Sequence, residues 1–77
     1  MEEMKNEYSK IVGNNIRKYR EMNYMNQTEL ANRIGVKQAA ISLYENGDRD
    51  PSTEMIYKIC DTLQIDFNEL FNPIGVL

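Results

Sequence analysis

Few residues in this 77-residue chain could do covalent or metal chemistry. The chain has one cysteine, Cys60, and no histidine, so neither an internal disulfide nor a structural zinc site is available to it. It also has no glycine-rich phosphate loop and no nucleophile beside a recognisable base, and so short a chain has no room for a deep pocket. We therefore expect no enzymatic activity, no metal and no cofactor.

The chemistry that remains is hydrogen bonding by amides and attraction between charges. A net charge of −3 and an isoelectric point of about 4.8 argue against a nucleic-acid partner, since phosphate binding normally relies on a surplus of Lys and Arg. However, seven basic residues face four acidic ones between Lys10 and Arg49, and the flanking segments together carry −6. The middle of the chain could therefore present a locally positive face to DNA.

The length and the N-terminal segment bear on location and domain number. The first ten residues carry acids where a secretory signal needs a basic stretch, and no apolar run approaches the ~20 residues that span a bilayer. We expect a cytoplasmic protein with no membrane partner. A chain of this length builds one core, so we expect no second domain for a small-molecule effector.

The polar groups must be positioned by helices, and the apolar residues predict five of them. Spacings of three and four predict the first helix over residues 4–22, with residues 1–10 as its N-terminal extension. Gly13 lies inside this helix, where a glycine costs roughly 1 kcal/mol against alanine. A fray or break of the helix could therefore occur near this residue.

Capping residues predict where the next two helices begin and end. Asn26 and Glu29 form a capping pair before the second helix, and Gly35 supplies the left-handed residue that ends it. The third helix follows Lys37 and stops at Gly47, which opens a polar loop. The second and third helices are therefore joined by a tight turn.

The last two helices complete the expected fold. The fourth opens with Pro51 at its first position, where the missing amide would have no partner anyway, and it holds Cys60 as a small buried hydrophobe. A short fifth helix follows a cap at Asp66. The expected all-α domain spans residues 11–71, and residues 72–77 form an apolar tail.

The residues around the turn at Gly35 are far more specific than the turn itself. The segments GNNIRKYRE, NQTELANRIGVKQAAISLYENGDRDP and LQIDFNELF resemble the Cro and phage-repressor family of helix-turn-helix proteins, also called the XRE type. The residues that match the family pattern are Arg20, Gln27, Leu30, Ala31, Gly35, Ile41, Ser42, Tyr44, Glu45, Gly47 and Pro51. The resemblance implies a five-helix, lambda-repressor-like domain whose helix-turn-helix is formed by the second and third helices.

The resemblance implies that the third helix enters the major groove and that its first residues meet base edges. The amide of Gln38 can donate and accept together, which matches the N6 and N7 edge of adenine. Ala39 and Leu43 offer methyl groups that could contact thymine methyls or only avoid a clash with the groove wall. Ser42 could bond to a base, to a phosphate or back to its own helix, and the sequence leaves these open.

Phosphate contacts are expected around this helix. The candidates are Gln27, Lys37, Asn46, Gly47, Arg17 and Arg49. Asn46 and the Gly47 amide resemble a clamp, whereas Arg17 and Arg49 could equally be solvated surface charges. Lys37 stands where the family usually has a Ser or Thr cap, so the third helix loses a cap and could gain a phosphate contact.

Two further features follow from the family pattern. Arg20 and Glu45 are similar to the family's structural ion pair, which ties the first helix to the end of the third and does not touch DNA. Tyr24 stands where a glycine often closes the first helix. Asn23 could adopt the left-handed conformation in its place, so we expect the turn to be shifted by one residue.

The implied function is that of a sequence-specific regulator of transcription which binds double-stranded DNA. The simplest mechanism is repression by occupancy of an operator as a homodimer, with half-sites roughly 34 Å apart. Dimer contacts are expected from the fifth helix and the tail, through Phe71, Ile74, Val76 and Leu77, although the tail could instead fold back on its own core. The alternative function is a protein-interaction or antitoxin-like module that uses the same fold.

Overall fold

The apolar stripes of the sequence become four α-helices and one short 3-10 helix. The computed structural model describes residues 7–73. The α-helices are α1 (Glu7–Met22), α2 (Gln27–Ile34), α3 (Gln38–Glu45) and α4 (Thr53–Leu63), and the 3-10 helix is η1 (Phe67–Phe71). No strand occurs within the described residues. The all-α prediction is confirmed, but the expected fifth α-helix is a 3-10 helix, because its five residues make little more than one α-helical turn before Pro73.

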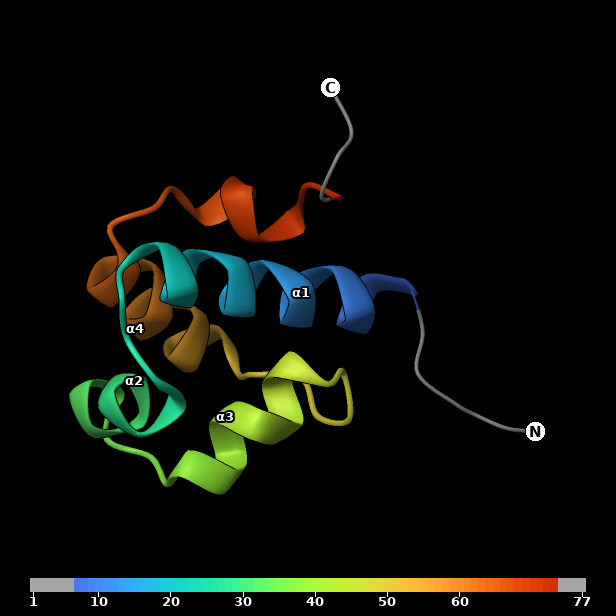
Figure 1. Cartoon of the computed structure of the whole chain (residues 1–77). Coiled ribbons are helices and arrows are strands. Elements are labelled where there is room, and N and C mark those ends of the chain that lie inside the picture. Colours follow the sequence, from blue (N-terminus) through green and yellow to red (C-terminus); the bar gives the residue numbers. More distant parts are fainter. Residues whose placement is uncertain (1–6, 74–77) are drawn as a thin grey trace.

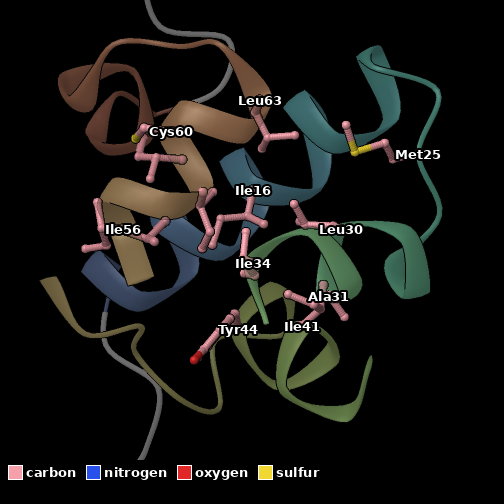
Figure 2. Packing of buried hydrophobic residues seen from close by; sticks show 13 residues of the cluster. Ile16, Met25, Leu30, Ala31, Ile34, Ile41, Tyr44, Ile56, Cys60 and Leu63 are labelled. Atoms are coloured by element: carbon pink, nitrogen blue, oxygen red, sulfur yellow. The ribbon is translucent and has the colours of Figure 1, made fainter. Parts of the chain in front are cut away.

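Helix α1 lies at the centre of the arrangement, with α3 packed on one side and η1 on the other (Figure 1). Side chains from all four α-helices meet in one core between them (Figure 2). The core residues are Val12, Ile16, Met25, Leu30, Ala31, Ile34, Ile41, Tyr44, Ile56, Ile59, Cys60, Leu63 and Leu70. Cys60 is buried there, as expected of a small hydrophobe.

Helix α1 runs without a break through Gly13, so the fray that the sequence left open there does not occur. A Cβ at this position would lie 2.4 Å from the carbonyl oxygen of Tyr44 and 2.8 Å from that of Glu45. The glycine therefore serves the close approach of α1 to the end of α3, and the packing compensates for its low helix propensity.

The turn between α1 and α2 differs from the expectation. Tyr24 itself adopts the left-handed conformation, with φ of 57°, and it is 94% exposed. The prediction that Asn23 would take this conformation is wrong: Asn23 directly follows α1, and its backbone amide still donates to the carbonyl oxygens of Tyr19 and Arg20, both at 3.1 Å. Its side-chain amide donates to the carbonyl oxygens of Tyr19 at 2.8 Å and Leu63 at 3.3 Å.

The capping predictions hold for α2 and fail for the start of α4. Asn26 and Glu29 form a reciprocal capping box. Pro51 is not the first residue of α4, because Ser52 precedes the helix and its hydroxyl accepts the Met55 amide at 3.2 Å. Pro51 is buried one residue before that cap. The helix therefore begins two residues later than predicted.

The C-terminal part is held to α1 by one buried amide. Asn15 is 1% exposed and donates to the carbonyl oxygens of Leu70 at 2.9 Å and Asn72 at 2.7 Å. This contact fixes η1 against the face of α1 opposite to α3. The tail contacts expected from Ile74, Val76 and Leu77, and residues 1–6 of the expected N-terminal extension over residues 1–10, lie outside the described residues, whereas residues 7–10 belong to α1.

Two further observations concern residues 7–73 alone. None of the helices in this part is long and apolar enough to cross a membrane. No group of three or more His, Cys, Asp or Glu residues in the same part is arranged to hold a metal ion.

Candidate nucleic-acid interface

Helices α2 and α3 form a tight corner that leaves one side of α3 uncovered. Gly35 turns the chain with φ of 80°, and its amide donates to the Ala31 carbonyl oxygen at 2.9 Å. Lys37 precedes α3 and makes no side-chain capping bond, as the missing Ser or Thr implied. The first four amides of α3 therefore lack a side-chain acceptor from the cap position.

The predicted base-reading residues lie along the uncovered side of α3. Gln38 and Ala39 in the first turn are exposed, while Ser42 and Leu43 in the second turn are half-buried. Ile41, Tyr44 and Glu45 occupy the buried side. The most exposed side chains of this face are therefore those of the first turn of α3. The first turn is also the part of a recognition helix that usually meets base edges.

Arg20 and Glu45 form a bidentate ion pair between α1 and the end of α3. Arg20 Nε donates to Glu45 Oε2 at 2.6 Å, and Nη2 donates to Oε1 at 3.0 Å. The side chains are 9% and 2% exposed. The third guanidinium nitrogen, Nη1, donates to the Met25 carbonyl oxygen at 2.7 Å. The hydrogen bond to Glu45 raises the pKa of Arg20 above its ordinary value, so the guanidinium stays charged at neutral pH.

Gln27 connects this ion pair to the exposed face. Its Nε2 donates to Glu45 Oε1 at 3.0 Å, and its Oε1 accepts from Gln38 Nε2 at 2.5 Å. Gln27 was expected from the sequence only to contact phosphate, and neither of these two bonds was predicted. A usable signal existed, because a buried carboxylate has more acceptor sites than a single arginine fills.

The expected phosphate contacts fall into different environments. Lys37, Asn46 and Arg49 are exposed. Arg17 is exposed and lies 3.5 Å from Glu21 Oε2, so an acidic neighbour partly neutralises it. The Gly47 amide does not face outward as a clamp, because it donates to the Tyr44 carbonyl oxygen at 3.1 Å.

The loop after α3 is fixed against the first turns of α1. Ser9 Oγ donates to Asp50 Oδ1 at 2.6 Å, and a Cβ on Gly47 would lie 3.5 Å from the backbone nitrogen of Lys10. The fold therefore brings the exposed Lys10 beside this loop, although the two are far apart in sequence. Lys10 was expected only to add to the positive charge of the middle segment, and its position beside this loop was not predicted.

Comparisons with known proteins agree with this geometry. The model of the HTH_3 family, described as helix-turn-helix, matches residues 16–70. The antitoxin PezA of Streptococcus pneumoniae serotype 4 is 30% identical, with 83% of this chain and 44% of PezA covered. The chain spans about half the length of the antitoxins that it matches.

Solved structures share the arrangement of helices. The restriction-modification controller protein C.AhdI from Aeromonas hydrophila has a TM-score of 0.77 and 28% identity, covering 82% of this chain and 96% of that one. The P22 c2 repressor protein in complex with synthetic operator 9T has a TM-score of 0.75 and 28% identity, covering 79% of this chain and 92% of the repressor chain. The family match spans both helices of the corner, and this chain therefore belongs to the HTH_3 family of helix-turn-helix proteins, the XRE type that its motif resembles.

Proposed function

We propose that the chain is a sequence-specific, double-stranded-DNA-binding regulator of transcription. The observation that carries this proposal is the exposed first turn of α3, where Gln38 is held by a hydrogen bond to Gln27 across the helix-turn-helix corner. A glutamine amide fixed at the start of such a helix suits a base edge in the major groove. The likeness to a repressor solved with its operator supports the same function.

Base reading is assigned to one face of α3. Gln38 contacts an adenine, and Ala39 beside it offers a methyl group to a thymine. Ser42 and Leu43 follow one turn later on the same side and are half-buried, so they reach the groove less far. The expected base preference is therefore concentrated at the step that Gln38 reads.

Phosphate contacts surround this face. Gln27, Lys37 and Asn46 border α3, and Arg49 extends from the loop that follows it. Arg17 contributes less, because Glu21 lies beside it. The Gly47 amide makes no phosphate contact of its own, since it is used within the fold, and Gly47 contributes only the left-handed turn, with φ of 75°, in the loop that carries Arg49. These contacts compensate for the chain's overall negative charge.

Regulation follows by occupancy of an operator. One domain of this size offers few contacts, so a homodimer on two half-sites, roughly 34 Å apart, is the expected binding form. Phe71 is half-buried beside Tyr8, at a ring-centroid distance of 5.5 Å, and belongs to the surface that we assign to the dimer contact. Residues 11–71 form the DNA-binding domain of this cytoplasmic repressor, and no enzymatic step is part of its action.

An antitoxin-like interaction module is the second candidate. The 30% identity to PezA favours it, as does the net charge of −3. In that case α3 would serve only as a helix of the scaffold, and a partner protein would occupy another surface. DNA binding and protein binding are separable by experiment.

The test is selection from a random duplex pool, followed by titration of the enriched duplex and a scrambled duplex at several salt concentrations. We expect enrichment of a two-fold symmetric sequence and an affinity that falls steeply with salt, because phosphate neutralisation releases counterions. Failure to enrich any sequence, with undetectable binding at low salt, contradicts the proposal and favours the interaction module.

A further inference from the structure

A continuous chain of hydrogen bonds joins the buried ion pair to the exposed amide of Gln38. Arg20 donates twice to Glu45, Gln27 donates to Glu45, and Gln38 donates to Gln27. The chain begins at a carboxylate that is 2% exposed and ends at an exposed side chain on the first turn of α3. Gln27 therefore has both ends of its amide engaged by these hydrogen bonds, whereas Gln38 has only its NH₂ end engaged.

The order of donors and acceptors in the chain has only one solution. An ionised carboxylate accepts hydrogen bonds and cannot donate them. Gln27 must therefore turn its NH₂ group toward Glu45, which leaves its oxygen facing Gln38. That oxygen accepts from the NH₂ group of Gln38. Turning either amide over would set two oxygens or two NH₂ groups against each other.

The exposed end of Gln38 is consequently a fixed pair of groups. One of its two N–H bonds is used by Gln27, so one N–H and the oxygen remain for a ligand. Adenine presents an acceptor at N7 beside a donor at N6, which this pair matches, whereas guanine presents two acceptors. An amide free to rotate could present its NH₂ group to guanine instead.

We propose that Arg20 and Glu45 are positioning residues for base reading, which act through Gln27 to set the amide direction of Gln38 and thereby its preference for adenine. This inference rests on the proposed DNA-binding function. Arg20 and Glu45 contact no base in it. The buried pair thus contributes to specificity as well as to the packing of α1 on α3.

The first test replaces the pair by apolar side chains in the double variant Arg20→Met/Glu45→Leu. Such a replacement of a buried pair is often neutral for folding, and Gln27 and Gln38 are left intact. We expect the ratio of Kd values for duplexes with guanine and adenine at the Gln38 step to fall about tenfold, the share of one bidentate base contact. Affinity for a scrambled duplex should stay within about twofold. An unchanged ratio in the folded variant overturns the inference.

The second test interrupts the series of hydrogen bonds at Gln27. Because Gln27 is only half-buried, this variant keeps the inference testable even where the double variant fails to fold. Gln27→Met keeps the length of the side chain and removes both hydrogen bonds. The same tenfold loss of adenine preference is expected. A uniform loss of affinity for all sequences would instead assign Gln27 to phosphate contact alone. Asn32→Met, on the exposed part of α2, is the matched control.

A third measurement needs no DNA. The side-chain NH₂ resonances of Gln38 in the wild-type protein should shift in Gln27→Met and in the double variant, and should stay in place in Asn32→Met. Unchanged resonances in every variant overturn the inference even where DNA binding is specific. A wild-type protein without any base preference overturns the proposed function and this inference together, and the resonances then report whether the hydrogen bonds nevertheless exist.

Discussion

Gly13 in α1 lies against the carbonyl oxygen of Tyr44 in α3, so closely that a Cβ on the glycine would stand 2.4 Å from that oxygen. The neighbouring carbonyl oxygen, of Glu45, would be 2.8 Å away. Both atoms belong to the backbone at the end of α3, so they cannot move aside as a flexible side chain could. The absence of a side chain at residue 13 therefore sets the distance between α1 and the helix assigned to DNA reading.

We expect Gly13→Ala to destabilise the fold by about 1–3 kcal/mol, the usual cost of forcing extra atoms into a packed contact. Helix propensity alone predicts the opposite, a gain of about 1 kcal/mol. Urea unfolding measures the difference. Asn14→Ala, at an exposed position of the same helix, is the control and should not destabilise the protein. A Gly13→Ala protein as stable as the wild type would contradict the close contact.

The left-handed Tyr24 leads to a prediction of the opposite sign. Tyr24→Gly should raise the free energy of unfolding by about 0.5–1 kcal/mol. The left-handed conformation costs a residue with a side chain roughly 1–2 kcal/mol, and part of the gain from removing that cost is offset because glycine loses more conformational entropy on folding. At 94% exposure, Tyr24 leaves little packing to lose. Asn23→Ala should destabilise, since it removes the bonds to Tyr19 and Leu63. Thermal unfolding of the two variants checks both signs.

Gly13 and Tyr24 show which parts of the fold could not be predicted from the sequence. The capping box of Asn26 with Glu29 and the turn at Gly35 were predictable because their causes are local. The unbroken helix at Gly13 and the left-handed Tyr24 were not predicted, because both are linked to contacts with other helices: Gly13 packs against Tyr44, and Asn23 donates to the Leu63 carbonyl oxygen. Sequence patterns report such contacts only indirectly.

The same distinction holds for the candidate site. The motif predicted which residues would line the outer side of α3, because helical periodicity fixes which positions share a face. It did not predict that Gln27 joins Glu45 to Gln38, since these bonds depend on how α2 and α3 cross. Nor did it predict that the Gly47 amide is used by Tyr44, which depends on how the loop turns after α3.

Stability should fall with rising pH through the titration of Cys60. Burial, more than the nearby Glu69 and Asp66, raises the pKa of its thiol above the ordinary value of 9.0. Near pH 9 the thiol of Cys60 then loses its proton only in the unfolded chain. The stability that the folded protein gains from the protonated thiol is therefore fully present below that pH and is lost as the pH rises above it. We expect the wild type to lose more stability than Cys60→Ala between roughly pH 8 and 10. Parallel curves for the two proteins would contradict the raised pKa.

Replacing Gln38 tests the base-reading assignment directly. Gln38→Ala should relax base preference at one position by ~1–3 kcal/mol, the discrimination of a bidentate contact, and leave non-specific affinity nearly unchanged. Its exposure means that folding should be unaffected. Titration of single-base variants of the selected duplex measures the effect. An equal loss at every position would show that Gln38 reads no base.

Replacing Lys37 by serine should raise the stability of the fold and lower the affinity for DNA. It precedes α3 without capping it, so Lys37→Ser should stabilise the protein by about 1 kcal/mol through a new bond to an early amide of the helix. The same change removes a positive charge beside the proposed DNA face, and it should lower the salt slope of binding by about 1 for every sequence alike.

Lys37→Ala separates the two effects, because it removes the charge without providing a cap. It should reproduce the weaker, less salt-dependent binding of Lys37→Ser and lack its gain in stability. Urea unfolding and titrations at several salt concentrations, made on the same preparations, give both quantities. If Lys37→Ser bound DNA as tightly as the wild type, Lys37 would be a solvated surface charge, and the absence of a cap at α3 would have no function in binding.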